Sequence, residues 1–172
     1  MATYEIINTT TVGSGGLSSI SFSAIPQTYT DLLLKFSGRN SRSNDNLQEF
    51  NIYFNNNTAG VYTVKYVRGS GSTAISNNYP SDTSFNQLGQ PAGTATSDTF
   101  SNYDIYISNY TNSVRKNVWI EGVTENNAVA AYAYFQAGIF DNTTPISTIT
   151  VTAPSYLITQ YSSFYLYGIK NS

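Results

Sequence analysis

The chain contains no cysteine and no histidine in its 172 residues, and these two absences exclude several classes of chemistry. Without cysteine there is neither a disulfide framework nor a thiol nucleophile. Without histidine there is no Ser-His-Asp triad, and most zinc, copper and non-haem iron sites lose their usual ligand. We therefore expect a protein without enzymatic activity, with no catalytic residues, no metal site and no cofactor.

Charged side chains are also scarce, at 10% of the chain, whereas about 25% is typical of soluble domains. Ten acidic and eight basic residues leave a net charge of −2, so the chain lacks the basic surface that binds nucleic acid or an anionic membrane. Neutral polar residues are abundant instead, with 22 serines, 21 threonines and 19 asparagines. A surface of this composition is suited to packing against another protein.

No segment has the features of a secretion signal or a membrane anchor. The chain opens Met1-Ala2-Thr3-Tyr4-Glu5, without the basic region and apolar run of a signal peptide. Nowhere do about 18 apolar residues follow one another, as a membrane-spanning helix would require. We expect a single domain over residues 1–172 that is made in the cytoplasm.

Short segments with apolar residues at alternate positions recur between clusters of glycine, asparagine, serine and proline, a pattern that predicts about nine or ten β-strands. The expected strands cover 4–12, 17–25, 31–38, 50–55, 61–68, 103–108, 117–124, 128–140, 146–152 and 163–169. Residues 13–16 are expected to close a hairpin between the first two strands. The fold class is therefore all-β, an antiparallel β-sandwich, with the jelly roll as the leading architecture and other Greek-key sandwiches as the alternative.

Residues 69–99 form the longest stretch without a clear strand pattern. The stretch is rich in serine, glycine, threonine and asparagine and contains Pro80 and Pro91. A loop of this length is unusual inside a compact domain. It is either a functional excursion or it conceals a short strand near 73–76. We expect it, together with the polar loop 39–47, to provide contact surfaces.

Acidic side chains are the remaining candidates for acid–base chemistry. Glycoside hydrolysis needs two carboxylates about 5 to 10 Å apart, whereas Glu121 and Glu125 on one predicted strand are separated by about 13 Å. Solvated carboxylates are the favoured interpretation. Asp45, Asn46 and Glu49 offer oxygen ligands for Ca²⁺, but their spacing is not that of an EF-hand, and a solvated loop is favoured there as well.

Tyrosine is the most informative residue type, with 15 copies. In residues 103–107 and 164–167, neighbours that must point to opposite faces of a sheet are both apolar or aromatic, so the second face requires cover. Residues 131–136 alternate alanine with tyrosine and place a tyrosine stripe on one face. These side chains either line the core or form a subunit interface, where tyrosine is enriched. The candidate interface residues are Tyr106, Tyr132, Tyr134, Tyr165 and Tyr167.

The interface interpretation has one testable consequence. Replacing Tyr132 and Tyr134 together by alanine is expected to weaken assembly. A sugar-stacking platform is a third interpretation of the aromatic residues, but such platforms normally contain more tryptophan than the single Trp119.

Five segments in order along nearly the whole chain carry a further signal: SAIPQTYTDL at 23–32, ISNY at 107–110, ENN at 125–127, AGIFDNTTPISTI at 137–149 and YSSFYLYGI at 161–169. Together they resemble a family of tailed-bacteriophage virion proteins, common in cyanophages and marine phages, in which similar opening and closing motifs bracket one β-sandwich module. The resemblance implies a structural part of the virion. It applies equally to capsid-associated proteins and to tail fibres or spikes.

Neither heptads nor a repetitive shaft accompanies the module, which favours a small capsid decoration or cement protein over a fibre. The expected partners are further copies of the chain, as a trimer, and the major capsid protein. Apolar and tyrosine surface buried across capsomer boundaries, multiplied over symmetric copies, would provide the binding. The alternatives are a receptor-binding tip of a tail fibre or spike and a carbohydrate-binding module for a host-surface glycan, and fold alone does not choose among them.

Overall fold

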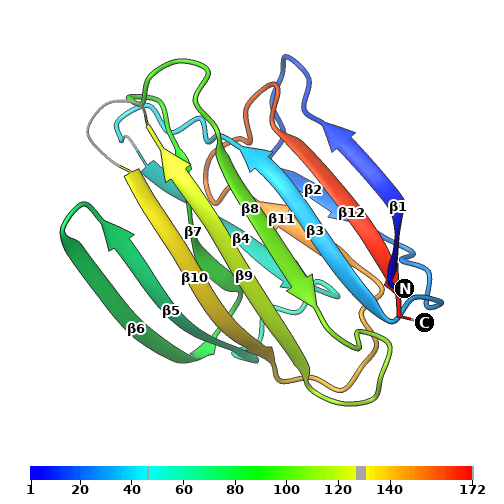
Figure 1. The fold of residues 1–172 in the computed structure, drawn as a ribbon. Helices are drawn as coiled ribbons and strands as arrows, with labels where there is room; N and C mark the ends of the chain where they lie inside the picture. The colour runs from blue at the N-terminus through cyan, green and yellow to red at the C-terminus, as the bar shows by residue number, and fades with distance from the viewer. Residues whose placement is uncertain (46, 127–130, 172) are drawn as a thin grey trace.

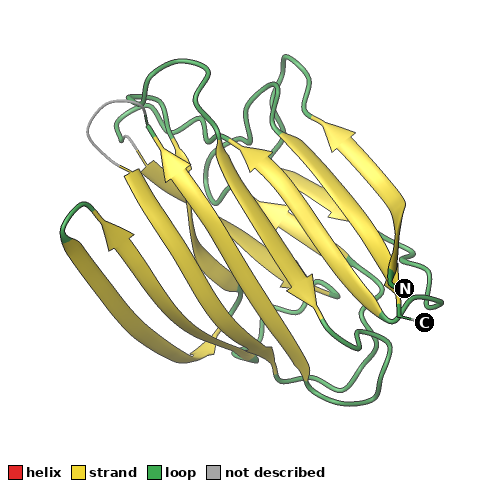
Figure 2. Ribbon diagram, viewed as in Figure 1, coloured by secondary structure: helices red, strands yellow, loops and turns green. Residues whose placement is uncertain are grey.

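The computed structural model describes residues 1–45, 47–126 and 131–171, and in this part of the chain every regular element is a β-strand (Figures 1 and 2). The strands form two antiparallel sheets packed face to face. The larger sheet has the order β1-β12-β3-β8-β9-β10-β5-β6, and the smaller has the order β2-β11-β4-β7. The all-β antiparallel sandwich is confirmed, whereas the jelly-roll topology stays a prediction.

The strands of the larger sheet are β1 (Thr3–Thr11), β3 (Asp31–Gly38), β5 (Tyr62–Ser70), β6 (Thr73–Asp82), β8 (Ser101–Ile107), β9 (Lys116–Glu125), β10 (Ala131–Phe140) and β12 (Ser163–Lys170). Those of the smaller sheet are β2 (Ser19–Phe22), β4 (Leu47–Phe54), β7 (Phe85–Pro91) and β11 (Ile149–Thr152). Each expected segment contains or overlaps one of these strands. Residues 128–130 of the expected segment 128–140 lie outside the described residues. The described residues include no helix long and apolar enough to cross a lipid bilayer.

The expected hairpin between the first two strands is wrong. The amide of Gly16 donates a hydrogen bond of 3.1 Å to the carbonyl of Gly13, so the segment does turn. However, β1 pairs with β12 in the larger sheet, whereas β2 pairs with β11 in the smaller one. The turn therefore carries the chain from one sheet to the other. Ile20 and Phe22 of β2 are buried in the core, whereas most side chains of β1 are exposed.

Residues 69–99 contain two strands, β6 and β7, in place of the expected long loop. The tentative strand 73–76 is the beginning of β6. A tight turn at Gly71, whose φ of 55° suits glycine, connects β5 to β6. The strand pattern of β6 is hidden because it is an exposed edge strand with polar side chains on both faces. In β7, Gln87 has a φ of 62° and interrupts the alternation of side chains.

The core lies between the two sheets and contains two clusters of aromatic rings. In the first, ring centroids lie 5.0 to 6.4 Å apart, and the members are Phe54, Tyr62, Phe85 and Phe140. The second cluster consists of Phe36, Phe50, Tyr103 and Phe164. Figure 1 shows β6 at the end of the larger sheet, beyond the strands of the smaller one. The smaller sheet therefore covers only part of the inner face of the larger sheet and none of its outer face.

Close packing at Gly138 of β10 provides a test of this core. A Cβ atom added at Gly138 would lie 2.4 Å from Cε1 of Phe85. We expect Gly138→Ala to lower the free energy of unfolding by about 1 to 3 kcal/mol, because overpacking forces neighbouring atoms to move. Gly69→Ala on the adjacent β5 is the matched control, since an added Cβ there has no neighbour within 4 Å. Urea denaturation of both variants measures the difference, and equal losses would contradict the packing.

Buried tyrosines are expected to make stability depend on alkaline pH. Burial raises the pKa of Tyr62 and of Tyr134 to about 12, from an ordinary value near 10. Between these values the unfolded chain has lost protons that the folded chain keeps, so the free energy of unfolding falls as pH rises from about 10 to about 12. Thermal unfolding at a series of pH values measures the effect. Tyr62→Phe should make the fall less steep, and a profile without a fall above about pH 10 would contradict the assignment.

Candidate functional site

The outer face of the larger sheet carries a row of apolar side chains across five neighbouring strands. The register places Trp119 opposite Tyr106, and Tyr106 opposite Leu33. Leu33 in turn lies opposite Tyr167, which lies opposite Ile6 at the edge strand β1. Directly opposed side chains in antiparallel strands have Cβ atoms about 4.5 to 5.5 Å apart, so the row is continuous. A face meant only for water would carry polar residues here.

A parallel row two residues further along the strands combines aromatic and charged side chains. Phe135 lies opposite Glu121, and Glu121 lies opposite Asp104. Lys35 follows between Asp104 and Tyr165, and its ammonium group forms a partly exposed ion pair with the Asp104 carboxylate. Two carboxylates and one lysine thus lie between two aromatic side chains. We call the two rows together the outer platform.

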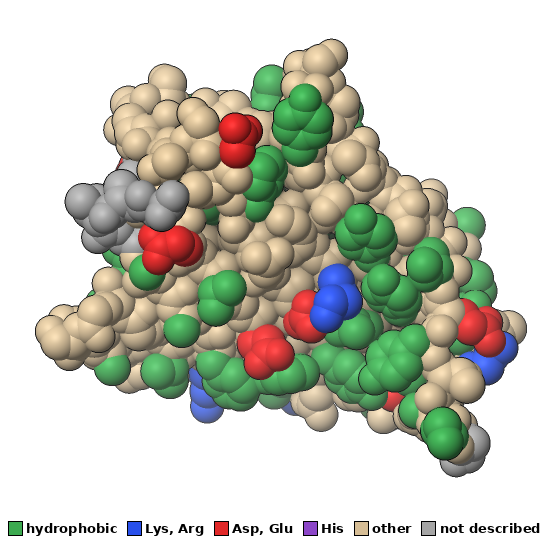
Figure 3. All heavy atoms as spheres, turned by 45° about the horizontal axis from the view of Figure 1, so that its top comes forward, with side chains coloured by type: hydrophobic (Ala, Val, Ile, Leu, Met, Phe, Trp, Pro, Cys, Tyr) green, Lys and Arg blue, Asp and Glu red, His purple; other side chains and the backbone are tan. Residues whose placement is uncertain are grey.

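The outer platform is exposed and slightly hollowed. Trp119, Phe135 and Tyr165 have exposed fractions of 39%, 50% and 38%, and an open hollow of about 470 Å³ lies over the apolar row. Figure 3 views this side obliquely and shows hydrophobic side chains gathered around a cationic and acidic group. Contiguous apolar surface of this kind is typical of a binding face.

Three of the predicted interface residues, Tyr106, Tyr165 and Tyr167, lie on this platform. Tyr106 also has a structural role, since its hydroxyl donates a 2.6 Å hydrogen bond to Oδ2 of buried Asp31. Burial and the Asp31 carboxylate together raise the pKa of Tyr106 to about 12. The assignment of these tyrosines to an interface stays a prediction.

The expectation of a surface stripe at Tyr132 and Tyr134 is corrected by the structure. Tyr134 is only 6% exposed and belongs to the core, and Tyr132 is partly buried against it. The reason is the parity of β10, in which Phe140 and Gln136 point inward and the even-numbered positions follow them. The exposed aromatic residue of this strand is instead Phe135. Of the two interpretations given to the stripe, lining of the core holds for Tyr134.

A second candidate site is a cleft of about 310 Å³ between the end of β5 and the edge of the smaller sheet. The Arg68 guanidinium on β5 lies 5.0 Å from the ring centroid of Tyr132 and 6.0 Å from that of Tyr134. Glu49 of β4 also lines the cleft, and burial raises the pKa of its carboxyl group, partly offset by a backbone hydrogen bond from Gln87 and by the charge of Arg68. We call it the Arg68 cleft.

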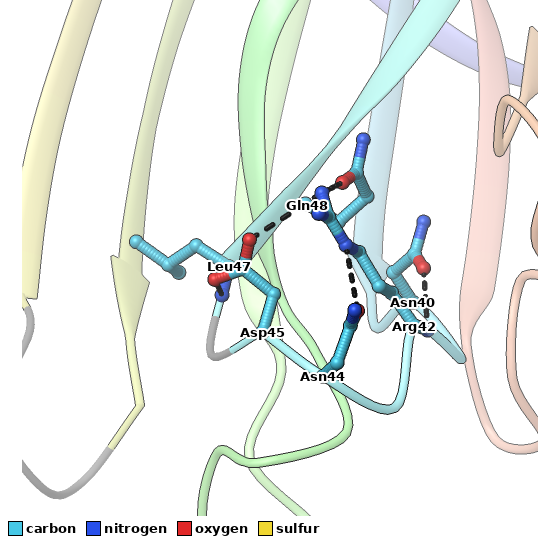
Figure 4. Close-up of polar contacts among 6 residues, drawn as sticks. All are labelled: Asn40, Arg42, Asn44, Asp45, Leu47 and Gln48. Carbon is cyan, nitrogen blue, oxygen red and sulfur yellow. Dashed lines mark hydrogen bonds and ion pairs between the residues drawn. The ribbon is translucent and has the colours of Figure 1, made fainter.

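Arg42 and Leu47, from the stretch expected to be a polar loop, line one wall of this cleft, and Arg42 is held by contacts with its neighbours (Figure 4). The Arg42 guanidinium donates to Oε1 of Gln48 and to Oδ1 of Asn44, and it lies 3.3 Å from Oδ2 of Asp45. The Arg39 guanidinium donates to carbonyl oxygens of the segment 92–99. These contacts hold the two arginine side chains in place.

The acidic residues considered as calcium ligands do not converge in the described part of the chain. Asp45 pairs with Arg42, Glu49 lines the cleft, and Asn46 lies outside the described residues. Residues 1–45, 47–126 and 131–171 contain no cluster of three or more histidine, cysteine, aspartate or glutamate side chains that could hold a metal ion.

The sequence interpretation missed the juxtaposition of Asp104 with Glu121, which lie directly opposite on β8 and β9. It paired Glu121 with Glu125 because both lie on one strand. The chain does turn at residues 109–112, where the amide of Asn112 donates a hydrogen bond of 3.1 Å to the carbonyl of Asn109. The whole connection extends from Ser108 to Arg115, and its length is the signal that fixes the register.

Comparisons with known proteins give no family assignment. No family model matches the chain, and no curated protein matches it. Among solved structures, the CBM2 module of the evolved Dit of Lactobacillus casei BL23 phage J-1 is 12% identical, with a TM-score of 0.26, over 90% of this chain and 69% of that one. A ruminal GH26 endo-beta-1,4-mannanase is 9% identical, with a TM-score of 0.16, over 99% of this chain and 20% of that one. Structural similarities with TM-scores this low carry no information about function.

The two locations of tyrosine predict different costs of truncation. We expect Tyr134→Ala to lower the free energy of unfolding by about 3 to 5 kcal/mol, as loss of a large buried ring does. Tyr165→Ala on the outer platform is expected to cost less than about 1 kcal/mol, because its side chain is 38% exposed. Urea denaturation at neutral pH measures both, and similar losses would contradict the inward orientation of Tyr134.

Proposed function

We propose that the protein is a non-enzymatic structural component of a phage particle that docks onto the outer surface of the capsid through its outer platform. The observation that carries the proposal is the continuous apolar row across five strands, from Trp119 to Ile6. Its partner in this proposal is the major capsid protein, and its role is to decorate and stabilise the head.

The chemistry of the platform supports a protein partner. Tryptophan and tyrosine are enriched at the centre of protein interfaces because they combine a large apolar area with a polar group. The charged row of Lys35, Asp104 and Glu121 lies beside this apolar area. Such a group contributes mainly to the orientation of docking, since a partner must present complementary charges in register.

The breadth of the platform favours docking onto a capsid surface over binding of a small ligand. The apolar row crosses five strands of a sheet, so it presents a broad area to a partner. The resemblance to virion proteins points to particles in which many copies of one site are arranged symmetrically. Repeated docking of modest strength would then accumulate by avidity.

Self-association as a homotrimer is a further part of the proposal. The edge strand β6 supports self-association as such, because residues 73–81 carry no charged side chain and are almost all exposed. The edge strands of monomeric proteins are commonly protected from pairing with another chain by charged residues, proline or a β-bulge. Here Pro80 is near one end of the strand, so most of its edge is open for pairing.

A receptor-binding tip of a tail fibre or spike, or a carbohydrate-binding module, is the second candidate. It is favoured by a different observation, the Arg68 cleft. The volume of this cleft, about 310 Å³, suits a small ligand and not the surface of another protein. In that case the ligand would be a host-surface glycan.

Quantitative mass spectrometry of purified particles, with this protein scaled to the major capsid protein, tests the location. We expect a copy number comparable to that of the capsid protein. A small symmetric number per particle would support the tail location instead, and absence from the particle would overturn the virion proposal.

The docking face is tested by the double variant Trp119→Ser with Tyr165→Ser in a binding assay with particles that lack the protein. We expect binding to fall by at least about tenfold, because both side chains are exposed on the platform. The matched control is Val114→Ser with Leu157→Ser, two similarly exposed apolar residues outside the strands. Equal binding by the two double variants would refute docking through the platform.

A further inference from the structure

The Arg68 cleft contains charged groups that are only partly paired. In the described part of the chain, the Arg68 guanidinium interacts with the Tyr134 hydroxyl, and its Nε atom is buried without an acceptor. Among the described residues no ion pair joins Arg68 to Glu49, although both line the cleft and the charge of Arg68 opposes the rise of the Glu49 pKa. Buried polar groups normally find partners, so this arrangement leaves donors and an acceptor available to a molecule in the cleft.

Neighbouring groups hold Arg68 in place. The rings of Tyr132 and Tyr134 lie within cation–π distance of its guanidinium. Gly89 forms part of the cleft and allows the Tyr134 hydroxyl to approach, because a Cβ at that position would lie 2.4 Å from the hydroxyl oxygen. A long, flexible side chain is thereby fixed in one orientation before any ligand arrives, which reduces the entropy lost on binding.

Gln48, which also lines the cleft, adds a further donor. Its Oε1 accepts a hydrogen bond from Arg42, and Figure 4 shows the amide nitrogen pointing away from that contact. The cleft therefore presents a guanidinium and an amide as donors and the Glu49 carboxyl group as an acceptor.

Charges of both signs line the cleft. Arg42, Arg68 and Glu49 are its charged lining residues, and Arg42 is already paired with Asp45, so Arg68 and Glu49 are the charged groups left to face a ligand. An anionic ligand would meet Glu49 and a cationic ligand would meet Arg68. A neutral ligand with several hydroxyl groups avoids both repulsions, since each hydroxyl can donate to the carboxyl group or accept from the guanidinium.

We propose that the Arg68 cleft binds a single neutral sugar unit, whose hydroxyl groups exchange hydrogen bonds with Arg68, Glu49 and Gln48. The volume of about 310 Å³ is at the lower end of the range for ligand sites, about 300 to 1,000 Å³, and suits one ring. This inference does not depend on docking to a capsid. A decorating protein with such a site would also attach particles weakly to polysaccharide.

The chain has four arginines, Arg39, Arg42, Arg68 and Arg115, so their Nε–H groups give few signals in an NMR spectrum. We would titrate the ¹⁵N-labelled full chain separately with glucose, galactose, mannose and N-acetylglucosamine, and then with acetate and phosphate. At least one sugar is expected to shift the Arg68 signal and leave that of exposed Arg115 unchanged. A shift by acetate or phosphate alone, or no shift with any of the four sugars, would overturn the proposal.

Glu49→Gln removes the acceptor charge at nearly constant shape and is expected to weaken sugar binding by about tenfold, as loss of a hydrogen bond to a charged group does. Asp141→Asn is the matched control, because Asp141 forms an exposed ion pair with Arg115 outside the cleft. If Glu49→Gln lowers the unfolding midpoint too far for titration, Arg68→Lys, which keeps the charge and removes Nε, replaces it. Undiminished binding by the variant used would refute the site.

The failure of this inference can be told apart from failure of the docking proposal. The outer-platform variant, Trp119→Ser with Tyr165→Ser, should bind sugar as the unmodified protein does. Glu49→Gln should bind particles as the unmodified protein does. A platform variant that lost sugar binding would place the sugar on the platform and overturn the assignment to the cleft.

Discussion

The difference in width between the two sheets is the constraint from which both candidate sites arise. Four strands cannot cover eight, so the smaller sheet buries the aromatic clusters around Phe54 and Phe36 and leaves the rest of the larger sheet without a second layer. On the outer face this leaves the apolar row exposed. At the edge of the smaller sheet it leaves the opening of the Arg68 cleft, which Arg68 and Glu49 both line. A sandwich with sheets of equal width would have closed this opening.

Period-two alternation was sufficient to find the strands that pack on the core, because one face of each must be apolar. It gave β3 with its observed bounds. It failed for β6, whose two faces are both exposed, and for the partner of β1, because pairing depends on which layer the chain enters after the turn. The same limit applies to the sites: the register that brings Asp104 opposite Glu121 depends on loop length and not on the pattern within either strand.

The segments that carry the resemblance to virion proteins meet one another in the fold. The Tyr29 ring packs directly against Gly168, at a distance that leaves no room for a Cβ atom. The Tyr110 hydroxyl donates to the carbonyl of Pro26, and the Gln27 amide donates to the carbonyl of Ile146 at 3.0 Å. The shared pattern is therefore explained by the closing of the sandwich. Such residues indicate the architecture, whereas the outer platform and the Arg68 cleft indicate what the protein could bind.

Charged residues are scarce in this protein, and those at the two candidate sites have different roles. On the outer platform, Lys35 is paired with Asp104 at a partly exposed position, where such a pair contributes little to stability and more to the orientation of a partner. In the Arg68 cleft, the guanidinium is held by aromatic rings and has no carboxylate in direct contact within the described residues. A partly buried cation without a close counter-ion costs stability. Binding of hydroxyl groups there would offset that cost, which is why the cleft, and not the more exposed platform, is the better place for a small polar ligand.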